Sequence, residues 1–174
     1  MTSLLKKKIK KIRCLIMDVD GVLTDGRIIL NDDGKEIKNF DVQDGFGIVL
    51  FQMSGYKTAI ISARTTPAVK ARAKDLKVGL VYQAAHPKVI AYQKVLKEYK
   101  LKDEQVCFIG DDLTDLGVLN RVGLAVTVPN GVQEVKDAAD YVTKSRGGEG
   151  AVRELVELIL KEHGVWKKII ERFQ

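Results

Sequence analysis

The stretch that decides the fold reads Met17-Asp18-Val19-Asp20-Gly21-Val22-Leu23-Thr24-Asp25-Gly26, and it follows the apolar residues 14–16. A short apolar run of this kind predicts a buried strand. Asp18 and Asp20 then lie at the carboxyl end of that strand, where open α/β sheets bind their ligands. Residues two apart in an extended chain point the same way, and Gly21 lets the chain turn away sharply. Two facing carboxylates need a cation, a shared proton or a strong donor between them, which indicates Mg²⁺ and phosphate chemistry.

A second acidic group follows another predicted buried strand. The apolar run 106–109 leads directly into Gly110-Asp111-Asp112-Leu113-Thr114-Asp115. Two strands that deliver acids at the same end of a sheet predict a pocket of hard oxygen ligands. Mg²⁺ prefers such ligands, and proteins hold it with one or two carboxylates plus substrate phosphate. A single Asp-x-Asp pair is more often a solvated turn, so the prediction depends on the two groups together.

The remaining sequence alternates between short apolar runs and helical segments. Further strands are expected at 58–61, 80–82, 124–126 and 141–142. Helices are expected at 44–53, 67–76, 88–99, 113–121, 132–138 and 151–162. This alternation predicts an α/β fold with a doubly wound parallel sheet. An Asp-Gly turn at 33–34 between two apolar runs predicts a small β-hairpin over about 26–41, inserted after the first strand.

The composition fits one soluble domain over residues 1–174. Hydrophobic residues make up 45%, charged residues 30%, and no apolar stretch approaches the length of a membrane span. Both cysteines lie in predicted buried strands, which argues against a disulfide framework and favours a cytoplasmic location. The net charge is +6, and the basic segment 6–11 is interpreted as a solvated arm rather than a signal peptide. Neither nucleic acid nor membrane is an expected partner, because aromatic residues are few and no binding motif is visible.

The motifs resemble, in kind and in order, those of the haloacid dehalogenase superfamily. The four matching segments are 18–25, Ile60-Ile61-Ser62, Lys88 and 110–115. Other segments narrow the resemblance to the cap-less 3-deoxy-D-manno-octulosonate 8-phosphate phosphatase family, namely 21–26, Asp44-Gly45-Phe46-Gly47, Ser62-Ala63-Arg64, Arg72-Ala73 and 148–154. The resemblance implies the fold of that superfamily without a cap domain. It also implies a Mg²⁺-dependent phosphoric monoester hydrolase in lipopolysaccharide biosynthesis.

The resemblance implies a role for each acid at the site. Asp18 is expected to be the nucleophile that forms an aspartyl phosphate, and Asp20 the general acid and then the base. Mg²⁺ is expected on a carboxylate oxygen of Asp18, the main-chain carbonyl of Asp20, and Asp111. Asp112 and Asp115 are expected behind these ligands, where they act through water or orient a lysine, or else cap the following helix.

Phosphate and sugar contacts are also implied by the resemblance. Ser62 and Lys88 are expected to bind the phosphate, although on sequence alone such residues are more often solvated. The substrate carboxylate calls for arginine, and Arg64 and Arg72 are the candidates. The sugar hydroxyls are expected to contact some of Asn39, Asp41, Asp44 and Gly45. Arg146, Arg153 and Glu154 belong to a carboxyl-terminal motif expected near the site. The family pattern is interrupted before Lys88 by the unusual pair His86-Pro87.

A site without a cap is open to water unless another subunit covers it. The resemblance implies a homotetramer joined through the hairpins, with Ile28, Ile29, Leu30 and Ile37 at the interface. Alternatively, the hairpin packs on its own domain. The tail at about 164–174 is either a mobile flap that reaches a neighbouring site or a packed terminal helix.

Three other functions compete with the first. One is the same chemistry on another sugar phosphate, such as a sialic acid 9-phosphate. A non-catalytic oligomerisation domain is a second, but such a domain is expected to have lost its acids, which are present here. The third is a nucleic-acid 3′-phosphatase, suggested only by the basic segment.

Overall fold

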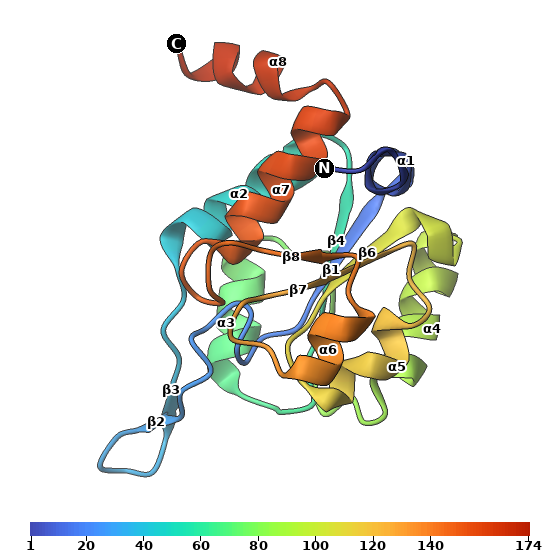
Figure 1. Ribbon diagram of the computed structural model, residues 1–174. Helices are drawn as coiled ribbons and strands as arrows, with labels where there is room; N and C mark the ends of the chain where they lie inside the picture. The colour runs from blue at the N-terminus through green and yellow to red at the C-terminus, as the bar shows by residue number, and fades with distance from the viewer.

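A parallel sheet with acids at one edge organises the molecule. The computed structural model describes residues 1–174, and its sheet strands are β1 (Cys14–Met17), β4 (Lys57–Ile61), β5 (Leu80–Tyr82), β6 (Val106–Ile109), β7 (Leu124–Thr127) and β8 (Tyr141–Val142). All six pair in parallel in the order β5-β4-β1-β6-β7-β8 (Figure 1). Successive connections run outward from β1 in both directions, which confirms the predicted doubly wound topology.

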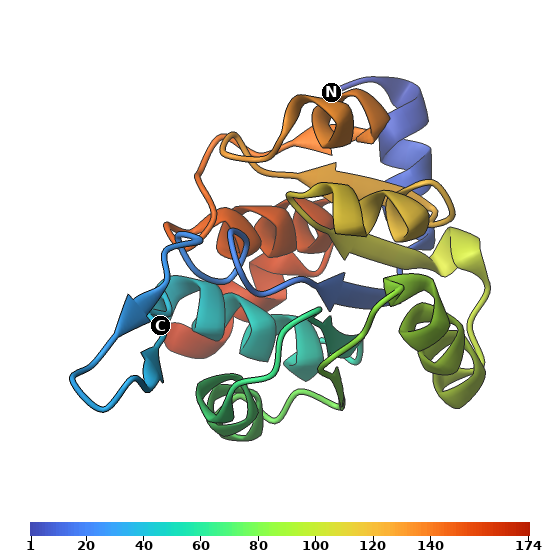
Figure 2. The same ribbon diagram turned by 90° about the horizontal axis from the view of Figure 1, so that it is seen from below.

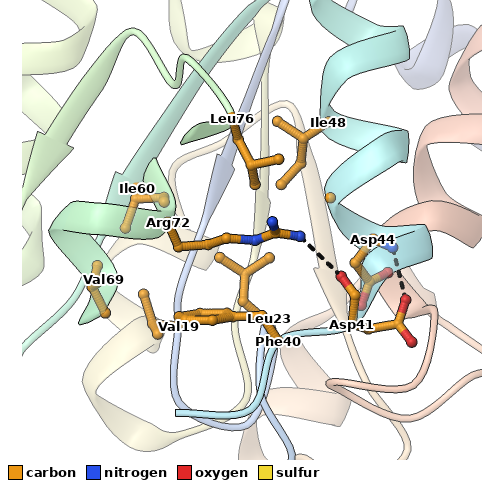
Figure 3. Close-up of a pocket in the computed structure, with 11 residues that line it drawn as sticks. Val19, Leu23, Phe40, Asp41, Asp44, Ile48, Ile60, Val69, Arg72 and Leu76 are labelled. Carbon is orange, nitrogen blue, oxygen red and sulfur yellow. Dashed lines mark hydrogen bonds between the residues drawn. The ribbon is translucent and has the colours of Figure 1, made fainter. Parts of the chain in front are cut away.

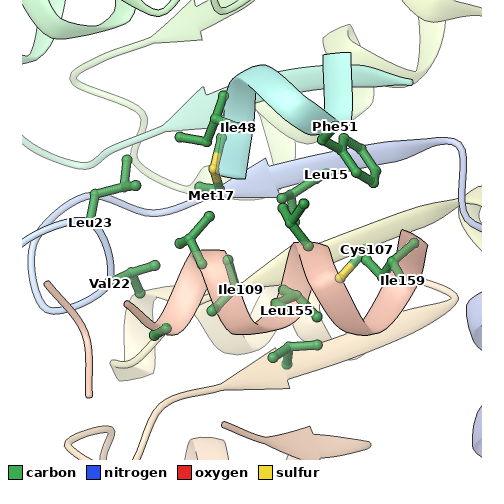
Figure 4. Packing of buried hydrophobic residues seen from close by; sticks show 14 of the residues in the cluster. Leu15, Met17, Val22, Leu23, Ile48, Phe51, Cys107, Ile109, Leu155 and Ile159 are labelled. Atoms are coloured by element: carbon green, nitrogen blue, oxygen red, sulfur yellow. The ribbon is translucent and has the colours of Figure 1, made fainter. Parts of the chain in front are cut away.

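The helices cover both faces of this sheet. Their bounds are α1 (Ser3–Lys11), α2 (Val42–Met53), α3 (Pro67–Asp75), α4 (Lys88–Tyr99), α5 (Leu116–Leu119), α6 (Gln133–Ala138), α7 (Ala151–Glu162) and α8 (Trp166–Ile170). Because successive strand residues point to opposite faces, Leu15 and Met17 join the core under α2 and α7, whereas Ile16 joins the core under α4 and α5. Figure 4 shows Leu15 and Met17 between the side chains of the two helices.

The hairpin leaves the body of the domain beside the site. It consists of β2 (Ile29–Leu30) and β3 (Glu36–Ile37), paired antiparallel as predicted. Figures 1 and 2 show the hairpin extending away from the sheet and its helices. Its apolar residues are uncovered in the single chain, where Ile28, Ile29, Leu30 and Ile37 are all exposed.

Both ends of the chain pack against the domain. The basic segment forms helix α1 with Ile9 fully buried, so the predicted solvated arm is wrong: an apolar side chain docks the helix, and most of its lysines stay exposed to water. The tail forms α8, with Ile169 only 6% exposed and Phe173 against Phe46, as expected for the packed alternative. None of the helices combines the length and apolar character needed to cross a bilayer.

One predicted helix is shorter than expected. Residues 113–115 form a 3₁₀ turn, and α5 then covers only Leu116–Leu119 instead of the predicted 113–121. The turn is tightened because Asp115 points inward and its Oδ2 accepts the backbone N–H groups of Asp111 and Asp112. Asp112 accepts the N–H of Leu113 at 2.7 Å, so the alternative of a capping role holds for this residue.

Candidate active site

The two acidic groups meet at the carboxyl ends of β1 and β6. A cleft of about 270 Å³ opens there, and it is lined by Asp18, Asp20, Gly26, Ser62, Ala63, Arg64, Lys88, Asp111, Asp112 and Thr114. The two strands are neighbours in the sheet, and they lie where the chain begins to wind in the opposite direction. Such a switch point is where open α/β sheets bind ligands.

A buried lysine holds the floor of the cleft together. Lys88 opens helix α4, and its Nζ lies 2.8 Å from Asp18 Oδ1 and 2.6 Å from Asp115 Oδ1. The three side chains are 1%, 8% and 0% exposed, so they are shielded from water. Because Asp115 also accepts two backbone N–H groups of its own loop, it fixes both the lysine and the loop that carries Asp111. The expected orienting role of Asp115 thus has a direct geometric basis.

Three carboxylates converge on one point of this floor. Asp18, Asp111 and Asp115 each offer an oxygen, and these oxygens lie within 4.8 Å of one another. Asp111 Oδ1 is buried and has no hydrogen-bond partner. With its three carboxylates ionised and Lys88 as the one cation in contact, the group carries a net charge of −2, and its donors are all hard oxygens. An unpartnered buried oxygen and an uncompensated double charge fit a divalent cation such as Mg²⁺.

Burial and mutual repulsion change how these groups ionise. Burial and the Asp115 carboxylate raise the pKa of Asp18 to about 7. Burial, Asp18 and Asp115 raise the pKa of Asp111 to about 8. Burial by itself would lower the pKa of Lys88, but the two neighbouring carboxylates outweigh it and the pKa is raised. Lys88 therefore remains charged, and a cation must compete with protons for Asp18 and Asp111.

Close backbone approach brings the loops of the site together. A Cβ on Gly21 would lie 2.0 Å from Asp111 Oδ2, and a Cβ on Gly147 would lie 1.7 Å from the Gly21 carbonyl oxygen. Asn130 links the same loops, since its Nδ2 donates to Gly21 O and its Oδ1 accepts from Gly147 N, both at 2.8 Å. Asn130 was not predicted as a site residue, because its partners are more than a dozen residues away along the chain.

Four charged side chains form a second group at the rim of the cleft. Lys38 Nζ donates to Asp20 Oδ1 and lies 2.8 Å from Glu36 Oε1, while Arg64 Nη2 donates to Glu36 Oε2 at 2.7 Å. Arg64 Nε also lies 3.8 Å from Asp20 Oδ2. We call these four residues the rim quartet. Glu36 and Lys38 were not predicted as site residues; the only signal in the sequence was that they alternate with the apolar Ile37.

Ser62 ends up where the second motif predicts, directly after β4. It is 2% exposed, it lines the cleft, and its Oγ accepts the backbone N–H of Arg64 at 3.2 Å. The loop before Lys88 returns to this point, because the N–H of Ala85 donates to the Ser62 carbonyl oxygen. The unusual His86-Pro87 pair therefore leaves Ser62 and Lys88 in the same cleft.

Several predicted substrate contacts lie in a neighbouring pocket instead. Arg72, Asp41, Asp44 and Gly45 line a small, mostly apolar pocket, and none of them lines the cleft (Figure 3). Arg72 Nη1 donates to Asp75 and its Nη2 to the Asp41 carbonyl oxygen. Asn39 is exposed and lines neither. Within the single chain, these residues are not brought to the predicted phosphate site.

Asp44 has a structural task in this arrangement. Its carboxylate accepts the backbone N–H groups of Gly150 and Arg153, at 3.3 and 2.8 Å, at the start of α7. Burial raises the pKa of Asp44 to about 6. A buried carboxylate that is used in this way anchors α7 to α2, and its predicted contact with a sugar hydroxyl has no support in its surroundings.

The carboxyl-terminal motif supports the site from behind. Glu154 accepts the N–H groups of Lys144 and Ser145 and the hydroxyl of Tyr141, which holds the loop that carries Gly147 against the first motif. This confirms that the motif lies close to the site. Arg153 instead points to the tail, where its guanidinium lies over Trp166, and Arg146 is exposed.

Known proteins resemble this chain in both sequence and structure. A sequence model of the haloacid dehalogenase-like hydrolases matches residues 78–155. The 3-deoxy-D-manno-octulosonate 8-phosphate phosphatase of Escherichia coli K12 is 41% identical over 157 residues, which cover 90% of this chain and 84% of that protein. The phosphatase of the same name from Yersinia pestis is 43% identical over 149 residues, covering 86% and 80%.

A solved structure agrees over the whole chain. The crystal structure of 3-deoxy-D-manno-octulosonate 8-phosphate phosphatase from Moraxella catarrhalis, in complex with a magnesium ion, a phosphate ion and a KDO molecule, is 39% identical. It superposes with a TM-score of 0.97 and covers 100% of both chains. With this fold, this cleft and relatives of 41% identity along most of their length, the chain belongs to the 3-deoxy-D-manno-octulosonate 8-phosphate phosphatase family of haloacid dehalogenase-like hydrolases.

Proposed function

We propose that the protein is a Mg²⁺-dependent phosphatase that hydrolyses 3-deoxy-D-manno-octulosonate 8-phosphate to the free sugar acid and phosphate, as a step in lipopolysaccharide biosynthesis. The observation that carries the proposal is the floor of the cleft. There the Asp18 carboxylate, which is 8% exposed, lies 2.8 Å from the buried ammonium of Lys88. It also lies beside the Asp111 carboxylate, which has an unpartnered oxygen. A nucleophile, a cation that attracts phosphate and a place for a metal ion are therefore present together.

Asp18 is the nucleophile in this proposal. One of its carboxylate oxygens attacks phosphorus, the bond from phosphorus to the sugar oxygen breaks, and an aspartyl phosphate forms. Water then attacks that phosphorus and restores the free carboxylate. Lys88 Nζ lies against Asp18 Oδ1, so it holds the carboxylate in place and offers positive charge to the phosphate oxygens. Ser62 lies on the other wall and supplies a hydroxyl for the same oxygens.

Asp20 moves the protons. Two residues beyond the nucleophile and half-exposed at the mouth of the cleft, it is placed to protonate the departing sugar oxygen and then to accept a proton from the attacking water. Asp18, Asp111 and the main-chain carbonyl of Asp20 would hold Mg²⁺ in the proposed site, with Asp115 behind them. When bound, Mg²⁺ supplies charge neutralisation between the carboxylates and the phosphate.

Arg64 is the proposed reader of the substrate carboxylate. The Arg64 side chain is 46% exposed at the rim. Of its three guanidinium nitrogens, only Nη2 donates a hydrogen bond. Its remaining N–H groups are available to a carboxylate, for which the planar guanidinium fork is suited. Arg72 does not line the cleft of its own chain. It remains a candidate only if assembly brings it to the cleft of a neighbouring subunit.

A panel of phosphate esters with and without Mg²⁺ tests the proposal. We expect kcat/KM to be highest for 3-deoxy-D-manno-octulosonate 8-phosphate and activity to disappear in EDTA. Equal turnover of unrelated esters, or faster turnover of a sialic acid 9-phosphate, would overturn the assigned substrate but not the chemistry. Arg64→Ala should raise KM for the sugar acid about 10-fold or more and leave KM for 4-nitrophenyl phosphate unchanged. The exposed Arg27→Ala is the matched control.

We also propose that the chain assembles as a homotetramer and works in the cytoplasm. The support for assembly is the uncovered apolar surface of the hairpin, made by Ile28, Ile29, Leu30 and Ile37. The support for location is that both cysteines are free and buried rather than paired. Light scattering tests the assembly; Ile29→Asp should shift the mass towards the monomer, and an unchanged mass would remove the hairpin from the interface.

A further inference from the structure

At the base of the hairpin, charged side chains contact two residues that line the cleft, and an apolar side chain is exposed to solvent. Glu36 and Ile37 form β3, and Lys38 follows directly. Alternation along an extended chain sends Glu36 and Lys38 to one side and Ile37 to the other. Accordingly, the side chains of Glu36 and Lys38 are 13% and 1% exposed, whereas Ile37 is 51% exposed.

Lys38 is held in one place by two carboxylates. Its ammonium donates to Asp20 Oδ1 and to Glu36 Oε1. A lysine side chain has considerable rotamer entropy, and burial between two fixed acceptors has already removed that freedom before substrate binds. In return, the lysine determines where Asp20 Oδ1 lies. Asp20 is the residue in the cleft whose orientation matters for proton transfer to the departing oxygen.

Glu36 connects the lysine to the arginine of the rim. Its Oε1 accepts from Lys38 and its Oε2 accepts from Arg64 Nη2, so both oxygens are engaged in charged hydrogen bonds. Arg64 is thereby anchored through a single nitrogen, and the rest of its fork stays open. The rim quartet contains two carboxylates and two cations and is neutral as a whole. It therefore needs no ion to persist, unlike the floor of the cleft.

We propose that Glu36 and Lys38 are positioning residues of this enzyme: Lys38 sets the orientation of Asp20 for proton transfer, and Glu36 sets the position of Arg64 for the substrate anion. The inference rests on the proposed function, since it takes Asp20 as the acid and Arg64 as the anion reader. It makes the hairpin part of the catalytic apparatus in addition to a surface between subunits.

The test for Lys38 compares a poor with a good leaving group. In single turnovers with Lys38→Met, we expect release of the sugar from the 8-phosphate to slow about 100-fold, because the alkoxide needs a proton from Asp20. Release of 4-nitrophenolate, which departs without one, should slow less than about 3-fold. Lys35→Met, an exposed lysine of the same hairpin, is the control and should change neither rate. Equal slowing of both esters, or no slowing, overturns the role of Lys38.

The test for Glu36 uses binding rather than bond cleavage, and it stands even if Lys38→Met does not fold. Glu36→Gln keeps the shape of the side chain and removes its charge. We expect KM for the sugar-acid phosphate to rise about 10-fold and KM for 4-nitrophenyl phosphate to stay the same. Asp33→Asn, in the exposed hairpin turn, is the control. An unchanged KM, or a lower one that reveals Glu36 as a competitor of the substrate, overturns the role of Glu36.

Failure of the proposed substrate has a different signature. If the wild-type enzyme does not hydrolyse 3-deoxy-D-manno-octulosonate 8-phosphate, the proposed function is wrong. The leaving-group comparison can still be repeated with any alkyl phosphate that the enzyme does hydrolyse. Slower alkoxide release with unchanged nitrophenolate release then still supports Lys38. Equal effects on both esters still count against it.

Discussion

Two charged groups face the same cleft, and they are balanced in different ways. The floor group, Asp18, Asp111 and Asp115 with Lys88, is largely shielded from water, and it carries a net charge of −2 when its three carboxylates are ionised. The rim quartet is neutral and partly open to water. The floor group comes from the ends of core strands and the loops that follow, so its geometry is maintained even though its charges repel. The rim comes from the hairpin and from the loops that follow β1 and β4, and its internal ion pairs hold it together.

This difference separates two tasks. An uncompensated buried charge favours binding of a cation and a phosphate, whereas in a neutral group the half-exposed Arg64 can exchange one partner for a substrate carboxylate at little cost. We therefore expect substitutions on the floor to affect catalysis and metal binding, and substitutions at the rim to affect selectivity.

The largest effect is expected for the nucleophile on the floor. Asp18→Asn should lower kcat by at least about 10⁴-fold for every ester, because no carboxylate remains to attack phosphorus. Rapid-quench assays measure the loss, and circular dichroism verifies that the variant is folded. If substantial activity remained, the floor would not supply the nucleophile and the contrast with the rim would lose its basis.

Removal of the single cation of the floor should affect stability. Lys88→Met leaves the buried carboxylates of Asp18 and Asp115 without their ammonium partner, and we expect a loss of about 3–5 kcal/mol in the free energy of unfolding at pH 8 in EDTA. Urea denaturation measures this loss. Lys97→Met, on the exposed side of the same helix, should stay within about 0.5 kcal/mol of the wild type. Similar stabilities of the two variants would show that the floor charges are not coupled to the fold.

The raised pKa values of the floor predict a pH dependence that Mg²⁺ opposes. Burial raises the pKa of Asp18 to about 7 and that of Asp111 to about 8, so the folded chain binds protons that the unfolded chain has already lost. These two groups therefore make the metal-free protein less stable as pH rises from about 4 to about 8. Mg²⁺ competes with these protons, so its affinity should increase between pH 6 and 8.

Calorimetry in buffers of different ionisation enthalpy should detect proton release when Mg²⁺ binds. At 100 times Kd, the metal should stabilise the fold by about 2.7 kcal/mol. Asp111→Asn is expected to remove most of this gain, while Arg64→Ala at the rim should keep it. If affinity for Mg²⁺ were independent of pH, the floor carboxylates would not be protonated in the free protein.

The smallest effect is expected at Asp44, which belongs to neither group. Asp44→Ala should destabilise the fold by about 1–2 kcal/mol, because two N–H groups at the start of α7 lose their buried acceptor. Asp44→Asn should lose less, since one amide oxygen remains as an acceptor. Urea denaturation distinguishes the variants, with Asp33→Ala as the surface control. A change in KM without a change in stability would instead indicate that Asp44 contacts the substrate.

Local patterns predicted the acids that follow β1 and β6, but they did not predict that the hairpin contributes Glu36 and Lys38 to the rim. Asp18, Asp20 and Asp111 follow apolar runs that form adjacent parallel strands, and parallel strands bring their carboxyl ends to one edge. Lys88 and Ser62 were identified only through the order of the motifs. Arg72 and Asp44 were assigned from motifs as well, but the structure uses their polar groups within the domain.

By itself, then, the sequence determined the doubly wound parallel sheet and the convergence of the acids at one edge of it, because hydrophobic periodicity and strand direction are local properties. Only the tertiary structure decided that the hairpin returns Lys38 to Asp20 across 18 residues and that Asn130 joins Gly21 to Gly147. Such contacts depend on loop paths and on the pairing of buried charges, and no periodic pattern in the chain encodes either one.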